Sequence, residues 1–184
     1  MSLYGQYFPD YVRPRTYMVL FFAISAVLLV LMFAVPFISP NGSFVDLDGK
    51  PGIMDHGNLW SQQDPLTMVL YGLGDMLCHQ EMDRTVMLNG SEMPVCIRDL
   101  GLLLGFAIGC VVTAVRFGDP VIYRNARAYV IISFLLIFSD WLIQRVFDLN
   151  VPLTRLITGL LAGAGFSLIL YCWIITIISK NDSE

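Results

Sequence analysis

The chain has 184 residues, of which 56% are hydrophobic and only 14% are charged, and its mean hydropathy is +0.66. Ordinary globular domains are about 25% charged, so this composition excludes most water-soluble folds. The net charge of −4 provides no basic surface, which argues against nucleic acid as a partner. We therefore expect an all-α integral membrane protein, a single membrane domain over residues 1–184 surrounded by membrane lipid.

Four apolar segments are long enough to cross a hydrocarbon layer about 30 Å thick. The predicted spans cover residues 17–38, 97–117, 126–147 and 156–179. The first span contains no charged residue and follows Arg13 and Arg15, so we interpret it as a retained anchor and not a signal peptide. The sequence thus predicts a four-helix membrane bundle.

The loop between the first two spans contains a further helical segment. Asp64 and Pro65 match an N-cap and a first helical residue, and a short apolar helix is predicted over residues 65–80. It is too short to span, so we expect a re-entrant or interfacial helix on the outer side. Asn89-Gly90 predicts a turn. His56 is interpreted as a solvated loop histidine.

Lysine and arginine in short loops mark the cytoplasmic side of a membrane protein. They gather in the two terminal tails and in the loop after the second span: Arg13, Arg15, Arg116, Arg124, Arg127 and Lys180. The loop over residues 39–96 instead carries eight acids, which we expect to be solvated. A cell-membrane location is predicted, with both termini cytoplasmic and this loop outside. Arg145 and Arg155 depart from the rule, so we expect structural contacts to hold them.

Several polar side chains are predicted near the outer ends of the spans. The apolar part of the third span is short, which places Asp140 on the order of 10 Å below the outer end of its helix. Gln144 shares its face. A charge at that depth needs a partner, and Arg98 and Arg155 are both candidates. The predicted ligand-binding residues are Arg98, Arg155, Gln144 and Gln80, and the candidate catalytic carboxylates are Asp140 and Asp99.

Glycines repeat every four residues in two of the spans. Gly101, Gly105 and Gly109 lie in the second, and Gly159 and Gly163 lie in the fourth. Small residues at this spacing let helices approach closely, so we predict that these two spans pack together.

Two of the four cysteines, Cys78 and Cys96, are predicted outside the spans. In one interpretation they bind zinc together with His79 and Asp99, because thiolate, imidazole and carboxylate suit that metal. In a second they form a disulfide, which an oxidising exterior permits. In a third, one thiol is redox-active or nucleophilic. Cys110 and Cys172 lie within spans and are interpreted as inert core residues.

The chain resembles an uncharacterised family of small prokaryotic, mainly archaeal, multi-pass membrane proteins. The resemblance is carried by two motifs: Gly74-x3-Cys78-His79-Gln80-x3-Arg84 with Pro94-x-Cys96-x-Arg98-Asp99-x-Gly101-x3-Gly105, and Asp140-x3-Gln144 with Arg155-x2-Thr158-Gly159-x3-Gly163. Many relatives have a second cysteine where this chain has Asp99. That exchange favours metal ligation over a disulfide. The resemblance implies no known activity.

Three hypotheses follow for function. The first is a polar, zinc-binding site at the outer membrane face that acts on a lipid or small solute, with the chain's status as an enzyme left open. The second is a small ion, proton or solute transporter that uses Asp140 as a homo-oligomer. The third is an accessory subunit of partner membrane proteins, stabilised by a Cys78–Cys96 disulfide.

Overall fold

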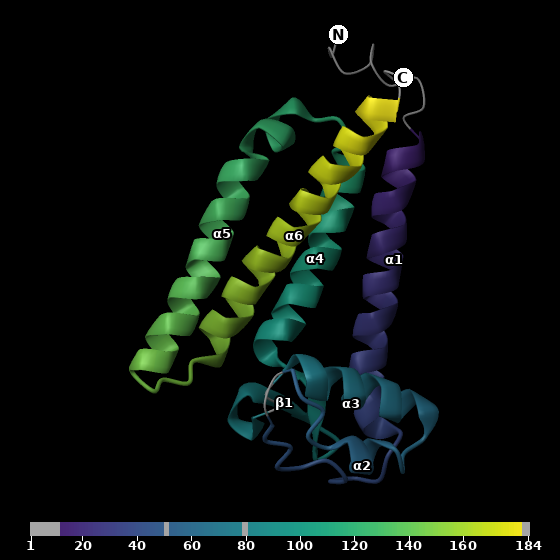
Figure 1. Cartoon of the computed structure of the whole chain (residues 1–184), viewed down its shortest axis with the longest axis vertical. Coiled ribbons are helices and arrows are strands. Elements are labelled where there is room, and N and C mark those ends of the chain that lie inside the picture. Colours follow the sequence, from purple (N-terminus) through teal and green to yellow (C-terminus); the bar gives the residue numbers. More distant parts are fainter. Residues whose placement is uncertain (1–11, 50–51, 79–80, 182–184) are drawn as a thin grey trace.

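A computed structural model describes residues 12–49, 52–78 and 81–181 of the chain. Within these residues, four long helices run alongside one another (Figure 1): α1 (Val12–Ala34), α4 (Ile97–Val115), α5 (Pro120–Val146) and α6 (Pro152–Asn181). Each contains a segment long and apolar enough to cross a membrane. The predicted all-α, four-helix membrane bundle is therefore confirmed.

Three of these helices begin earlier than the apolar patterns predict, and α1 starts at Val12 instead of residue 17. Helix α5 starts at Pro120 instead of residue 126, because the Asp119 side chain accepts a hydrogen bond from Val121 N at 2.9 Å and Pro120 fits the first helical position. Helix α6 starts at Pro152 instead of residue 156. Hydropathy does not detect these turns because they carry polar residues.

The segment between α1 and α4, residues 38–96, folds at one end of the bundle (Figure 1) and is called the cap here. Its main helix, α3 (Pro65–Leu77), begins as predicted: the Asp64 side chain accepts from Leu66 N at 3.0 Å and from Thr67 N at 3.1 Å. It ends three residues before the predicted boundary, with Cys78 as its C-cap. The short helices α2 (Gly57–Trp60) and η3 (Met82–Arg84) flank it, and η2 (Val35–Phe37) follows α1.

A two-stranded antiparallel hairpin completes the cap, formed by β1 (Thr85–Leu88) and β2 (Ser91–Cys96). Its turn residues Asn89 and Gly90 have φ angles of 51° and 66°, the left-handed conformation that two-residue hairpin turns require. The Asn89 side chain donates to Pro36 O at 2.9 Å and so fixes the turn against the end of α1. The sequence analysis predicted the turn and missed the strands.

Two acids of the cap are buried, which corrects the expectation that all eight loop acids are solvated. Asp75 and Glu92 each have 0% exposure. Asp75 accepts from Trp60 Nε1 and from His56 N, both at 2.9 Å. His56 Nδ1 also lies 3.4 Å from Asp75 Oδ1, so His56 is not the solvated loop residue that was expected.

Glu92 connects the hairpin to the start of the loop. Its Oε1 accepts from Asp46 N at 2.7 Å, and Tyr71 OH donates to its backbone carbonyl at 2.7 Å. Burial is the largest effect on this carboxyl and raises its pKa, and the nearby negative charges add to the rise. The rings of Trp60 and Tyr71 stack with centroids 5.1 Å apart. The cap is therefore a packed unit, and its core continues into the ends of α1 and α4 through Met32 and Leu100.

Helices α4 and α6 pack through their glycines, as predicted. A Cβ at Gly101 would lie 2.6 Å from Leu156 O, and a Cβ at Gly105 or Gly163 would overlap the facing backbone. This contact fixes the ends of α4 and α6 beside the cap. Helix α5 packs against α6, and only 11% of its candidate span is buried in the molecule, which suits contact with lipid.

Candidate functional site

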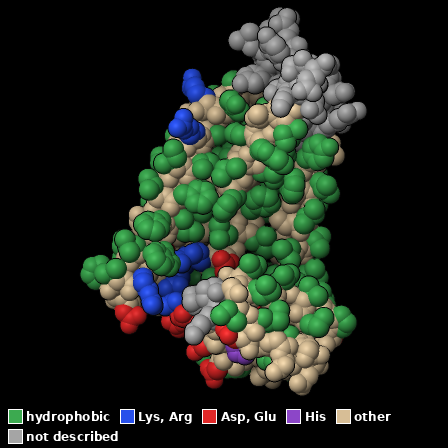
Figure 2. All heavy atoms as spheres, in the orientation of Figure 1, with side chains coloured by type: hydrophobic (Ala, Val, Ile, Leu, Met, Phe, Trp, Pro, Cys, Tyr) green, Lys and Arg blue, Asp and Glu red, His purple; other side chains and the backbone are tan. Residues whose placement is uncertain are grey.

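The cap meets the bundle at a polar cavity of about 310 Å³. We call it the arginine cavity because four arginines line it: Arg84, Arg98, Arg145 and Arg155. They come from η3, α4, α5 and α6, so four separate elements build the cavity. Figure 2 shows basic side chains gathered where the cap end of α5 faces the cap, with acidic side chains around them. The rest of this face of the bundle is largely apolar.

A cluster of metal-ligating groups adjoins the cavity. Cys78 is the C-cap of α3, Cys96 is the N-cap of α4, and Asp99 lies in the first turn of α4. One ligand atom from each of the three lies within 4.8 Å of the others. Cys96 Sγ donates to Asp99 Oδ2 at 3.1 Å. Both thiols also line the cavity, so two members of this cluster form part of its wall.

The geometry of this cluster fits a single metal ion. Zinc–sulfur bonds are about 2.3 Å long and zinc–carboxylate bonds about 2.0–2.2 Å, so one ion could contact all three groups after small side-chain movements. Two further predicted residues, His79 and Gln80, lie outside the described residues. In the described part of the chain no disulfide joins Cys78 to Cys96.

Asp140 lies beside the cavity and has three hydrogen-bonding partners. Its Oδ2 accepts from Arg98 Nη2 at 2.9 Å and from Thr158 Oγ1 at 3.3 Å, and its Oδ1 accepts from Gln144 Nε2 at 2.7 Å. Of the two arginines predicted as possible partners of Asp140, Arg98 is therefore the one that forms the ion pair. The Arg98 and Asp140 side chains are 16% and 10% exposed, so the ion pair is largely shielded from water. It joins α4 to α5 near the cap.

Gln144 extends this network to α6. Its Nε2 also donates to Thr154 Oγ1 at 3.0 Å, and its Oε1 accepts from Arg155 Nε at 2.5 Å. Arg155 is only 5% exposed, yet within the described residues it forms no ion pair. Its hydrogen-bonding partner Gln144 is neutral. The positive charge of Arg155 is therefore buried, and none of the described carboxylates forms an ion pair with it.

The other arginines of the cavity differ in their charge balance. Arg84 Nη1 contacts Glu81 Oε2 at 2.8 Å, which compensates its charge. Arg145 is exposed and makes no ion pair in the described part of the chain. With Arg98 and Arg84 paired, Arg145 and Arg155 leave the cavity with excess positive charge. Such a site attracts anions.

The sequence analysis did not assign Arg84, Arg145, Glu81 or Trp141 to the site, although all four line the cavity. Two signals could have found the arginines. Arg84 belongs to the motif of the family resemblance, and Arg145 violates the loop-charge rule on the same side as Arg155. Glu81 and Trp141 carry no comparable signal in the sequence.

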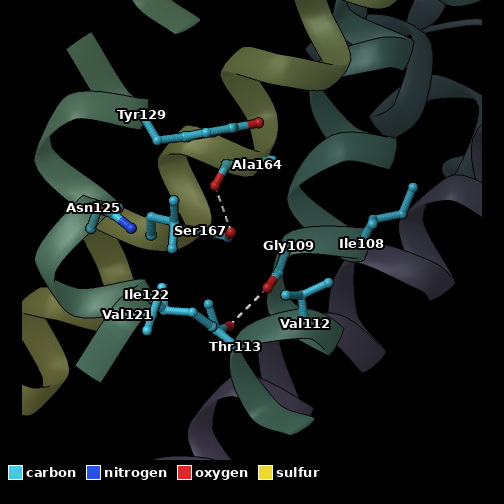
Figure 3. A pocket seen from close by; sticks show the side chains of 12 residues that line it. Ile108, Gly109, Val112, Thr113, Val121, Ile122, Asn125, Tyr129, Ala164 and Ser167 are labelled. Atoms are coloured by element: carbon cyan, nitrogen blue, oxygen red, sulfur yellow. Dashed lines mark hydrogen bonds between the residues drawn. The ribbon is translucent and has the colours of Figure 1, made fainter. Parts of the chain in front are cut away.

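A second, larger cavity of about 440 Å³ is lined by residues of α4, α5 and α6 (Figure 3). It is lined mainly by apolar side chains and contains no charged residue. Its hydroxyl groups already bond to backbone: Thr113 Oγ1 donates to Gly109 O at 2.8 Å and Ser167 Oγ to Ala164 O at 2.7 Å (Figure 3). This apolar cavity therefore lacks the charged side chains that line the arginine cavity.

Four membrane-length helices with a polar cavity at one end define a polytopic integral membrane protein. The chain belongs to the family described as "Predicted membrane protein (DUF2085)", whose model matches residues 78–169. The match begins at Cys78 and includes the other residues of the metal-ligating cluster and all four arginines of the cavity. Comparison with curated proteins and with solved structures finds no match.

Proposed function

We propose that this membrane protein binds a zinc ion at Cys78, Cys96 and Asp99 and uses the adjoining arginine cavity to bind a small solute or a lipid headgroup. The observation that carries the proposal is the convergence of two thiols and a carboxylate within 4.8 Å, with both thiols in the wall of a polar cavity. Three groups from two different helix ends do not meet in this way by local sequence alone.

The ligand set favours zinc over other divalent ions. Thiolates are soft ligands that select zinc, whereas magnesium and calcium prefer sites made only of oxygen. Three protein ligands would leave a coordination position toward the cavity, as in catalytic zinc sites, and a zinc ion there supplies a Lewis acid. His79 is the fourth ligand that the sequence predicts. If it binds, the ion instead serves to tie α3 to α4.

Asp140 supports this site by holding Arg98 and Gln144 in place. Both of its oxygens are used by Arg98, Gln144 and Thr158, which suits a residue that orients the arginines more than one that carries protons. This arrangement gives little support to the transport hypothesis. Asp99 lies within 4.8 Å of both thiols, so its proposed role is that of a zinc ligand.

We also propose that the cap lies on the outer side of the cell membrane. Arg116, Arg124 and Arg127 lie around the α4–α5 connection, at the end of the bundle opposite the cap (Figure 1), as expected for the cytoplasmic side. Arg145 and Arg155, which conflict with that rule, both line the cavity. A role in the cavity would explain why these two arginines lie at the end of the bundle assigned to the outer side.

Metal analysis of the purified full chain tests the zinc proposal. We expect about one zinc per chain in the wild type and loss of the metal in the Cys78→Ser/Cys96→Ser variant. Cys172→Ser, which changes a half-buried cysteine within α6, is the matched control and should keep its zinc. Less than about 0.2 zinc per chain in the wild type, zinc that persists in the double variant, or a Cys78–Cys96 disulfide by mass spectrometry would each overturn it.

A further inference from the structure

We infer that the arginine cavity binds an oxyanion of the phosphoryl class and that Arg155 is its principal binding residue. The inference deepens the proposed function and rests on it, because it names the chemical class of the ligand that enters the same site. It does not require the metal, since the arginines and the thiol cluster are separate groups.

The buried charge of Arg155 is the first observation. Arg155 is only 5% exposed and lines the cavity, and its Nε donates to the neutral amide of Gln144. A buried ion is costly unless an opposite charge compensates it. Arg98 shows the usual solution in the same site, because Asp140 pairs with it at 2.9 Å. Arg155 lacks such a carboxylate among the described residues, so a bound anion would supply the missing charge.

Unsatisfied donors are the second observation. The Nε atoms of Arg84 and Arg98 are both buried and find no acceptor within the described part of the chain. A buried N–H group without an acceptor destabilises the folded state. Both arginines line the cavity, so a rotation of their guanidinium groups would let the oxygens of a ligand held there accept from them.

The arrangement of the arginines indicates the class of anion. Guanidinium groups from η3, α4 and α6 approach one cavity from three elements. A phosphoryl group offers three oxygens in a tetrahedral arrangement and can bond to several such groups, whereas a carboxylate offers two oxygens in one plane. The volume of about 310 Å³ is near the lower end for small-molecule sites, so it suits a phosphate or a headgroup phosphate without acyl chains.

Two sources share this chemistry: inorganic phosphate from solution and the phosphate of an anionic lipid. Calorimetric titration of the full chain in detergent with inorganic phosphate tests the first. Titration with nanodiscs that contain phosphatidic acid, against nanodiscs of phosphatidylcholine alone, tests the second. We expect binding of at least one of these phosphate sources, and the arm that binds identifies the source.

Three variants make the test specific. Arg155→Gln should weaken binding about tenfold or more, and Arg145→Gln, at an exposed position that cannot impair folding through the core, should weaken it severalfold. Arg124→Gln makes the same charge change near the opposite end of the bundle and should bind as the wild type does. Equal binding by wild type and Arg155→Gln, or binding in neither arm, would overturn the inference.

Two further measurements distinguish phosphate binding by Arg155 from a purely structural role of this residue and from the zinc proposal. If Arg155 were only structural, Arg155→Gln would lower the melting temperature yet keep the wild-type rise on addition of phosphate, and that result would also overturn the inference. The Cys78→Ser/Cys96→Ser variant should still bind phosphate, with Arg155 dependence. Phosphate binding without zinc in the wild type would refute the metal proposal alone, and zinc without phosphate binding would refute the inference alone.

Discussion

Asp140 and Arg155 illustrate two ways in which a membrane helix can keep a charge. Asp140 is surrounded by donors from three residues, one of them the oppositely charged Arg98. Arg155 is equally inaccessible to water, and in the described chain its bond to Gln144 brings no negative charge. The interactions of Asp140 are complete within the fold, which indicates a structural role. The charge of Arg155 is not compensated by a described residue, which indicates that Arg155 binds a ligand.

This difference predicts the effect of neutralising Asp140. Asp140→Asn leaves Arg98 mostly buried without its counter-charge, so we expect a loss of about 3 kcal/mol in the free energy of unfolding. Thermal unfolding in detergent measures the effect. Asp119→Asn is the matched control, because Asp119 pairs at 3.4 Å with an arginine that is 68% exposed, and asparagine preserves the helix cap. Equal destabilisation by the two changes would contradict the role given to the Asp140 pair.

At the scale of elements, the contact between α4 and α6 determines where the site forms. Arg98 and Arg155 lie close to the glycines of their own helices. The position of the glycine contact along the two helix axes therefore determines where both arginines lie relative to the cap. Gly159 faces the Arg98 carbonyl itself. Helix α3 is positioned differently. Its N-cap residue Asp64 fixes where the helix begins, and the aromatic core of the cap holds it in place, so that Cys78 lies at the start of α4.

The glycine contact can be tested by adding single methyl groups. In Gly105→Ala and Gly163→Ala the new Cβ would overlap backbone atoms of Leu160 and Leu102, which cannot move without separating the helices. We expect each change to cost about 1–3 kcal/mol in unfolding free energy. Gly72→Ala in α3 is the control, since its Cβ would meet only Met54 Cε at an ordinary 3.6 Å. Thermal unfolding that ranks Gly72→Ala with the other two would refute close α4–α6 packing.

At the scale of the whole molecule, the cap and the α4–α5 connection lie at opposite ends of the bundle (Figure 1). The cap places the arginine cavity at one end of the spans, within reach of both solvent and lipid headgroups. The side of the membrane on which it lies therefore decides which solutes can enter. The distribution of arginines predicts the outer side.

Labelling with a membrane-impermeant maleimide in intact cells tests this orientation. Ser43→Cys places a thiol at an exposed position of the cap and should react in intact cells. Arg124→Cys, exposed near the other end, should react only after permeabilisation. The parent chain with its four native cysteines gives the background. The reverse pattern would place the cap in the cytoplasm.

Four features could be predicted from the sequence alone: the membrane class, the four apolar helices, the N-cap of α3 at Asp64 and the close packing of α4 with α6. These features depend on neighbouring residues: continuous hydropathy, a capping side chain, or a four-residue glycine repeat along one helix face. The N-terminal turns of α5 and α6 were missed because they are polar. The hairpin was missed although Asn89-Gly90 gives a local signal for it.

Only the tertiary structure decided which charges meet. It paired Asp140 with Arg98, gave Arg155 no ion pair among the described residues, buried Asp75 and Glu92 inside the cap, and placed Cys78 beside Cys96 and Asp99. These outcomes depend on the rotation of each helix about its axis and on contacts between segments distant in the sequence. Periodicity places a residue on a face of its own helix, whereas packing between elements determines what that face meets.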